Sequence, residues 1–263
     1  METTGENFFQ VKKERSYISC LVNGCSYGFR HLGMLLRYIW PSLVLTMVLP
    51  IPFVFLFVAQ VDAILRKWIE LGYLPNVTLK VMRRDVEKCA NRSALKVLIY
   101  IIWLLVVLLF LFLPVLFGIR IWWGLIASFV AWLLLLPLSF VIMQISYSNI
   151  TISACFKDGL KTACRNYGKL FAFEFLSNLL IFIVVLLGSI PYLIIFAAGM
   201  QAYRGMQMGD VLDLPVLFPL YVALSVFILE AVFLITAIVF SFSRCLMWGS
   251  LVNEVPTESK ADI

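Results

Sequence analysis

The sequence predicts an all-α fold, a polytopic bundle of membrane helices. Apolar residues make up 62% of the 263 residues and charged residues only 14%, whereas a soluble domain is close to half apolar and a quarter charged. Charged residues are also missing from long stretches of the chain, and about 20 apolar helical residues are enough to cross the hydrocarbon core. Helices are expected because lipid offers the backbone no hydrogen-bond partners.

Five membrane segments are expected, and four to six are compatible with the pattern. Runs of 24, 23, 36, 29 and 30 residues lack charge, except for one glutamate in the last run. They place the segments at 38–61, 97–119, 121–146, 172–200 and 214–243. The second and third segments form a tight hairpin, because only Arg120 separates them.

The first segment permits two topologies. It contains Pro41, Pro50 and Pro52, and an internal proline can break a helix. A broken segment dips into the membrane and returns to the side from which it came, whereas an unbroken one spans. Irregular backbone exposed to lipid is not tolerated, which argues against the dip, so the sequence leaves both versions open.

Lys and Arg set the expected orientation, because they are enriched in cytoplasmic loops. Residues 62–96 carry eight, residues 147–171 carry four and the tail from Arg244 carries two, against one each at the Arg120 turn and around Arg204. Both topologies therefore place the C-terminus in the cytoplasm, in the plasma (inner) membrane if the source is prokaryotic. The dipping version also puts all six cysteines on the reducing side.

These assignments divide the chain into five regions. They are an N-terminal tail with an interfacial amphipathic helix (1–37), membrane segments one to three with a basic loop at 62–96 (38–146), an interfacial basic helix (147–171), membrane segments four and five (172–243), and a cytoplasmic tail (244–263).

A weak internal repeat relates two of these regions. The pattern C-x3-G-x5-R-x2-G-x-L occurs at 20–35 and again at 155–170, an offset of 135 residues. Apolar residues spaced by three and four positions, as on one face of a helix, precede the apolar run in each copy. The expected faces are Ile18, Leu21, Val22, Cys25, Phe29 and Leu32 in the first copy, and Ile152, Phe156, Leu160, Ala163 and Tyr167 in the second. Chance similarity between two interfacial helices is the alternative.

The second copy also has a basic face, formed by Lys157, Lys161, Arg165 and Lys169. A basic amphipathic helix next to a membrane segment typically lies in the interface, with its cations among anionic headgroups. The sequence therefore predicts that these four side chains contact the headgroups of the lipid bilayer.

Glu230 is the most informative single residue, because it lies near the centre of the last segment. An ionised carboxylate at that depth costs at least about 2.5 kcal/mol, and such residues often line a pathway for ions or substrates. A neutral carboxyl that is hydrogen-bonded to another helix is the alternative interpretation.

Glu174 and Asn178 lie one turn apart on the fourth segment. They predict either a functional polar patch or a boundary carboxylate that touches water or Lys169. The Gly-Ser-Ile-Pro sequence at 188–191 predicts either an unwound segment, as in some transporters, or a proline kink.

Small residues line one face of the third segment, at Gly124, Ala127, Ser128 and Ala131. Such stripes let helix backbones approach closely. The face is therefore expected to pack, either inside the molecule or against a membrane-protein partner or a second copy of the chain.

Patterns typical of enzymes are missing from the sequence. It has a single histidine, His31, and no C-x2-C pair, P-loop or G-x-S-x-G, so no catalytic residue, metal or cofactor is expected. Nor does it contain a nucleic-acid-binding module.

The sequence favours a non-enzymatic scaffold or accessory protein of the membrane. The alternative is a small-molecule or ion transporter or channel that uses Glu230, and a polar cavity reaching that carboxyl would favour it. An intramembrane lipid enzyme is a third hypothesis, which a cluster of Glu174 with His31 would favour.

Overall fold

The computed structural model describes residues 11, 13, 15–74, 79–116, 121–148, 150–208 and 214–253. In this part the chain is 91% helical without strands, which confirms the all-α prediction. The helices are α1 (Tyr17–Arg30), α2 (Leu32–Val48), α3 (Pro50–Leu71), α4 (Leu79–Leu116), α5 (Ile121–Tyr147), α6 (Ile152–Arg165), α7 (Tyr167–Gly188), α8 (Ile190–Gln207) and α9 (Phe218–Asn253). Four of them are long and apolar enough to cross a membrane, or five if α1 and α2 form one bent span.

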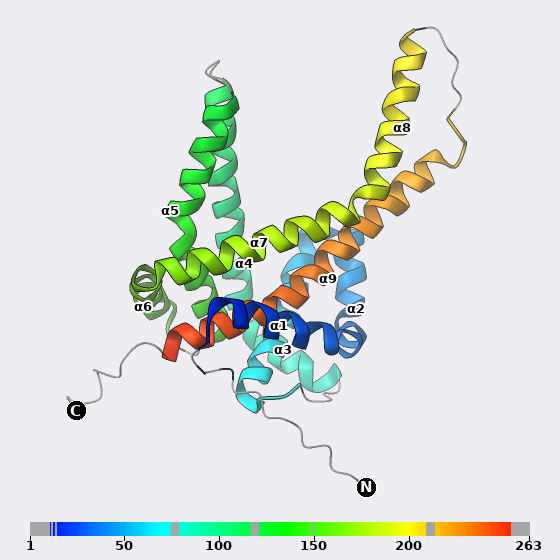
Figure 1. Cartoon of the computed structure of the whole chain (residues 1–263). Helices are drawn as coiled ribbons and strands as arrows, with labels where there is room; N and C mark the ends of the chain where they lie inside the picture. Colours follow the sequence, from blue (N-terminus) through cyan, green and yellow to red (C-terminus); the bar gives the residue numbers. More distant parts are fainter. Residues whose placement is uncertain are drawn as a thin grey trace, which may run out of the picture.

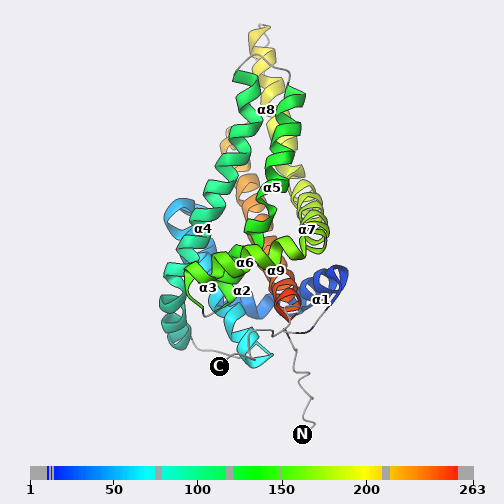
Figure 2. The same ribbon diagram turned by 90° about the vertical axis from the view of Figure 1, so that its left-hand side faces the viewer.

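The helices form a base from which two arms rise (Figure 1). One arm is the hairpin of α4 and α5, and the other is α8 with the first half of α9. The base holds α1, α3, α6 and the end of α9, and Figure 2 shows the same division after a quarter turn. With 38 residues, α4 is about 57 Å long at 1.5 Å per residue. It is therefore longer than the hydrocarbon core of about 30 Å and runs from the arm into the base.

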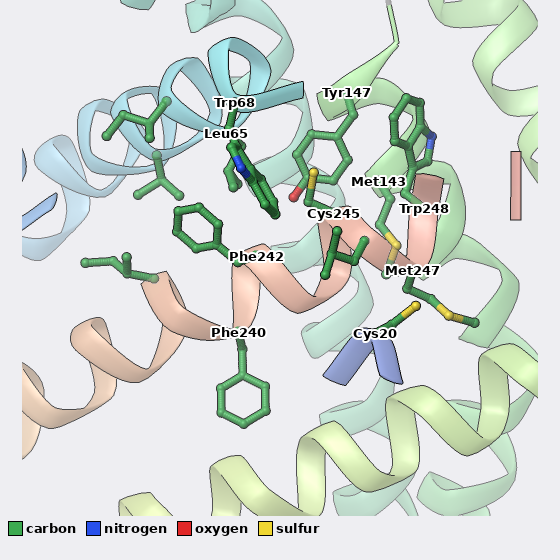
Figure 3. Packing of buried hydrophobic residues seen from close by; sticks show 14 of the residues in the cluster. Cys20, Leu65, Trp68, Met143, Tyr147, Phe240, Phe242, Cys245, Met247 and Trp248 are labelled. Atoms are coloured by element: carbon green, nitrogen blue, oxygen red, sulfur yellow. The ribbon is translucent and has the colours of Figure 1, made fainter. Parts of the chain in front are cut away.

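Aromatic side chains hold the base together. The ring of Trp68 on α3 is fully buried, with its centroid 4.7 Å from that of Tyr27 and 5.0 Å from that of Phe242. Tyr147 and Trp248 join α5 to α9 in the same way, with centroids 5.6 Å apart. Figure 3 shows Trp68 and Tyr147 beside the last part of α9, which carries Phe242 and Trp248. Large aromatic contacts of this kind give the base a core like that of a soluble domain.

The predicted first segment consists of two helices. α2 ends at Val48 and α3 begins at Pro50, and the two pack against each other, with the Ser42 hydroxyl on α2 donating to the Gln60 side chain on α3. This hairpin is the arrangement that the dipping version predicts. Its backbone break is consistent with the proline sequence, because proline removes a helical hydrogen bond.

The two ends of the described chain lie side by side in the base. The Arg15 amide donates to the Ser250 hydroxyl at 2.8 Å, and this hydroxyl donates back to the Arg15 carbonyl at 3.0 Å. The beginning of α1 and the end of α9 therefore share one side of the molecule, opposite to the tips of the arms. The Arg120 turn lies outside the described residues, as do the first ten residues and the last ten.

The stretch 62–96 is largely helical, rather than a loop. α3 continues to Leu71, and α4 begins at Leu79. The charged residues here were expected to end the membrane helices, but they form ion pairs instead, such as the 2.5 Å pair of Lys67 with Asp85. Helices that extend beyond the hydrocarbon core can carry charge without interruption.

The predicted segment 172–200 also differs from the structure, because it bends at Ser189 between α7 and α8. The Ser189 amide still donates to the Val185 carbonyl at 2.8 Å, and the Leu193 amide donates to the Ser189 carbonyl at 2.9 Å. Helical hydrogen bonds thus continue through the bend, which has the character of a proline kink at Pro191 rather than an unwound segment.

The structure supports the internal repeat. The bounds of α1 and α6 differ by 135 residues at both ends. Each helix ends at a bend with similar backbone angles, φ −102° and ψ 7° at His31 and φ −109° and ψ 28° at Asn166. Each helix also packs closely through a glycine of the repeated pattern. A Cβ at Gly24 would lie 2.4 Å from the Ser243 Cα, and a Cβ at Gly159 would lie 3.2 Å from the Val141 Cα.

Most of the apolar face predicted for α1 is exposed, and α1 packs against the protein mainly through another face. Ile18, Val22 and Phe29 are 51%, 58% and 62% exposed, whereas the face with Cys20 and Gly24 is buried against α9. On α6 the buried residues are likewise Cys155, Gly159 and Ala163, while Ile152 and Leu160 are exposed. Small residues at the contact let the backbones approach closely. Leu21 is buried beside them, whereas Ile18, Val22 and Phe29 remain exposed.

Candidate functional site

In the described part of the chain, two ion pairs with a buried carboxylate join helices, besides the more exposed pair of Lys67 with Asp85. The first joins α3 to α4, where Lys96 Nζ lies 2.7 Å from Asp62 Oδ1. The Ser93 hydroxyl donates to the other oxygen of Asp62 at 2.9 Å. The Asp62 side chain is only 2% exposed, so these two partners replace the water that a carboxylate requires.

The second ion pair joins α7 to α9. Arg244 Nη2 lies 3.2 Å from Glu174 Oε2, and the Glu174 side chain is 5% exposed. Arg244 also donates from Nη1 to the hydroxyl of Tyr100 on α4 at 3.2 Å. Arg244 therefore connects three helices, which its planar group with five N–H donors allows.

A cavity of about 290 Å³ lies among α3, α4, α5, α7 and α9. Its polar lining includes Lys96, Tyr100, Asn178 and Arg244, whereas neither of the two paired carboxylates lines it. The rest of the wall is mainly apolar, with Phe57, Val58, Val61, Ile142, Met143, Ile181, Phe233, Ile238 and Phe240. This is the composition of a small-molecule site, an apolar pocket with a few convergent polar groups. We call it the central cavity.

A side chamber of about 40 Å³ adjoins the central cavity and shares Tyr100, Asn178 and Arg244 with it. Buried polar atoms without a hydrogen-bond partner in the described structure belong to four of its lining residues. They are Trp103 Nε1, Ser139 Oγ, Glu174 Oε1 and Arg244 Nε. Buried polar groups normally have partners, and the chamber is large enough for water. The chamber therefore suits water or a polar group of a ligand.

Glu230 lies elsewhere. It lines a cavity of about 410 Å³ that is otherwise apolar except for Thr46, together with Val54, Val185, Leu229, Phe233 and Leu234. The Thr46 hydroxyl donates to the Ser42 carbonyl of its own helix at 2.6 Å. Phe233 lines both this cavity and the central cavity. The Glu230 cavity is thus not the polar cavity that the transport hypothesis expected around this carboxyl.

The structure brings two of the predicted site residues together. Glu174 forms one of the ion pairs, and Asn178 lines both the central cavity and its side chamber. His31 is not near them in the contacts described, since its ring stacks on Tyr27 at 4.2 Å. The cluster of Glu174 with His31 that would favour a lipid enzyme is therefore not the arrangement in this structure.

The other predicted residues lie outside the central cavity. The side chains of Lys157, Lys161, Arg165 and Lys169 are exposed around α6. Gly124, the first residue of the predicted stripe of small residues, packs inside the α4–α5 hairpin. A Cβ at this position would lie 2.3 Å from the Leu111 carbonyl oxygen. Ala131 is buried, and Ala127 and Ser128 are half-buried.

Sequence reasoning missed Asp62, Lys96, Tyr100 and Arg244. A signal was present, because Asp62, Lys96, Glu174 and Arg244 each border a charge-free run. Such boundary charges usually contact headgroups or water, and nothing in the sequence alone says that these four pair with one another.

Among the described residues, no group of three or more His, Cys, Asp or Glu is arranged to hold a metal ion. Comparison of the chain with protein-family models, with curated proteins and with solved structures finds no match.

Proposed function

We propose that this membrane-embedded protein is a transporter that binds a small solute in the central cavity. The observation that carries the proposal is the convergence of Lys96, Tyr100, Asn178 and Arg244 on one cavity. Lys96 and Tyr100 lie on α4, in the helix series α1–α4 that begins with the first copy of the repeated pattern. Asn178 and Arg244 lie on α7 and α9, in the series α6–α9 that begins with the second copy. Solute sites at the contact between two repeats are typical of secondary transporters.

The proposed orientation places the base in the cytoplasm. The base contains the ends of α3 and α9, the beginning of α4 and all of α6, and these carry most of the Lys and Arg residues. The positive-inside tendency then puts both ends of the described chain in the cytoplasm, in the plasma membrane if the source is prokaryotic. The cations of α6 would contact anionic headgroups there.

Alternating access would come from motion of one half against the other. The central cavity is bounded by α3 and α4 on one side and by α7 and α9 on the other. The bends at His31, Asn166 and Ser189 are points about which whole helices can pivot. Rocking of two rigid units around a fixed site is the usual transport mechanism in repeat-containing membrane proteins.

A cysteine-accessibility experiment tests this proposal without knowledge of the solute. Asn178→Cys is introduced into the full chain after its six cysteines have been replaced, and a membrane-impermeant thiosulfonate anion is added to one side of proteoliposomes at a time. A transporter that alternates between two states exposes residue 178 to both sides. Modification from one side only, or from neither, would contradict the proposal.

The matched control is Ser177→Cys. Ser177 is the neighbouring residue on α7, but it is 0% exposed and does not line the central cavity. It should remain unmodified from both sides in protein that elutes as a single folded species. Modification of both variants would indicate unfolding or a leaky membrane rather than access through the cavity.

A scaffold remains a second candidate, favoured by the exposed apolar surfaces of the separated arms. Leu193, Ile194 and Phe196 on α8 are between 48% and 64% exposed, and the two arms diverge in Figure 1. A helix from a membrane-protein partner or a second copy could pack on such a surface. Stoichiometric co-purification of one partner in mild detergent, without two-sided access to residue 178, would favour this function.

A further inference from the structure

We infer that the solute held by the central cavity is a small organic anion with an apolar part. This inference rests on the proposed binding of a solute, and it adds the chemical class of that solute. Three features of the structure carry it: the sign of the charge on the cavity wall, the hydrogen-bond donors that are left over, and the apolar remainder of the wall.

The charged wall of the central cavity is cationic. Lys96 and Arg244 line it, whereas their partners Asp62 and Glu174 do not. Each carboxylate thus lies behind its cation as seen from the cavity. This arrangement lowers the cost of burying the cations and still presents positive charge to a ligand. In the central cavity itself, a cationic ligand would meet two like charges, because the Glu174 carboxylate lines only the adjoining side chamber.

Several hydrogen-bond donors at the same wall have no acceptor among the described residues. Lys96 has three N–H groups, and its one described bond goes to Asp62. Tyr100 accepts from Arg244, which leaves its own hydroxyl proton to donate. The Asn178 amide has no hydrogen bond in the part of the chain that the structure describes, although it lines the cavity. A ligand rich in acceptors, such as a carboxylate, complements this set.

The side chamber extends the donor surface past Arg244. Of its unpartnered atoms, Trp103 Nε1 and Arg244 Nε are N–H donors, Ser139 Oγ can donate or accept, and Glu174 Oε1 accepts. A water molecule accepts two hydrogen bonds and donates two, so water in the chamber can bond to each of these four atoms. The anionic head would then lie at the junction, beside Tyr100, Asn178 and Arg244, which line both spaces.

The remainder of the central cavity suits a short apolar body. Ile181, Phe233, Ile238 and Phe240 line it, and its volume of about 290 Å³ is at the lower end of ligand pockets. Short aliphatic or aromatic carboxylates fit this combination, whereas inorganic anions would leave the apolar wall unused.

Binding of three matched probes to the purified full-length protein tests the inference. Hexanoate, hexanol and hexylamine share one chain and differ in head group, and isothermal titration in neutral-lipid nanodiscs measures each. Hexanoate should bind at least tenfold more tightly than the other two. Equal affinity for hexanol, or tighter binding of hexylamine, would overturn the assignment of an anion.

Two variants of the central cavity test whether hexanoate binds there. Asn178→Leu and Tyr100→Phe each remove one proposed donor and leave both ion pairs in place, so each should weaken hexanoate binding about tenfold, the equivalent of about 1.4 kcal/mol. Glu230→Gln, in the other cavity, is the control and should not change it. Unchanged affinity in both cavity variants would overturn the site.

Nanodiscs with an anionic lipid separate two sources of the same head-group chemistry. If hexanoate binds equally well there, the ligand is a free organic acid. If anionic lipid abolishes the binding competitively, an anionic lipid headgroup occupies the site, and the anion class is still supported. The cysteine experiment is independent of both results. Two-sided access without hexanoate binding would support transport and contradict an anionic solute. Hexanoate binding without two-sided access would support the anion site and contradict transport.

Discussion

The central cavity and the Glu230 cavity place charge in different ways. The central cavity has two cations on its wall, each paired with a carboxylate from another helix. The Glu230 cavity is larger, at about 410 Å³ against about 290 Å³, but has a single carboxyl in an apolar wall. An isolated intramembrane charge is conspicuous in a sequence, whereas charges that pair across several helices can be recognised only in the structure.

The largest effect should follow from removing one member of an ion pair. Glu174→Leu leaves Arg244 without its carboxylate and should lower the free energy of unfolding by about 3 kcal/mol, since breaking a buried pair typically costs 3–5 kcal/mol and Arg244 is 25% exposed. Thermal unfolding in detergent measures the loss.

The control for this prediction is the double variant Glu174→Leu with Arg244→Leu. It removes both charges together and should recover most of the stability, because apolar replacement of a whole buried pair is often neutral. A single variant as stable as the native protein would mean that water in the side chamber already solvates Arg244, and the ion pair would lose its structural role.

Tyr100→Phe should have an intermediate effect. It removes the hydroxyl that accepts from Arg244 at 3.2 Å, and a hydrogen bond to a charged group contributes about 1.5–3 kcal/mol. The expected loss of stability is about 1 kcal/mol, because water in the adjoining chamber can replace the hydroxyl. Chemical unfolding with a fluorescence readout resolves this difference, and a loss as large as that of Glu174→Leu would contradict it.

Substitution of Glu230 should have a smaller effect. Its carboxyl has no hydrogen bond or ion pair in the described structure, and its surroundings are apolar. Glu230→Leu and Glu230→Gln should each remain within about 0.6 kcal/mol of the native stability, the average of a hydrogen bond between membrane helices. In a deletion-complementation assay, both variants should support full activity. If Glu230→Gln folds normally but loses activity, the prediction is wrong. The ionisable carboxyl of Glu230 would then have a role in transport, and its cavity rather than the central cavity would be the candidate site.

The smallest effect on stability is expected for Asn178→Ala. The side chain lines a cavity and makes no hydrogen bond in the described structure, so its removal should change stability by less than about 0.5 kcal/mol. A thermal unfolding curve checks this. A clear destabilisation would show that Asn178 holds helices together and is not free to meet a ligand.

The sequence predicted the helices well because lipid leaves the backbone few alternatives, and it identified Glu174 and Asn178 as polar groups inside an apolar run. It did not predict the pairs, because Asp62 meets Lys96 across 34 residues and Glu174 meets Arg244 across 70. A charge at the end of an apolar run fits a headgroup as well as it fits an interhelical partner. Only the tertiary arrangement distinguishes the two.

The amphipathic helices teach a similar lesson. Periodicity correctly predicted helices containing Cys20 and Cys155, and it grouped the larger apolar side chains on one face, but it did not say which face packs against the protein. The face that packs carries Gly24 and Gly159, because α9 and α5 approach these backbones closely. In water, large apolar side chains favour burial. Beside a membrane, lipid can cover them equally well, so hydrophobicity no longer identifies the contact face.

The pairing of Arg15 with Ser250 has a consequence for biosynthesis. These residues are separated by 235 positions, and ribosomes add about 5–20 residues per second. About 10–50 seconds therefore pass between the synthesis of α1 and the synthesis of the α9 residues against which it packs. During this time its exposed apolar residues Ile18, Val22 and Phe29 can lie against a membrane surface. Although α1 is made before α9, its docking is thus completed only after α9 has been made.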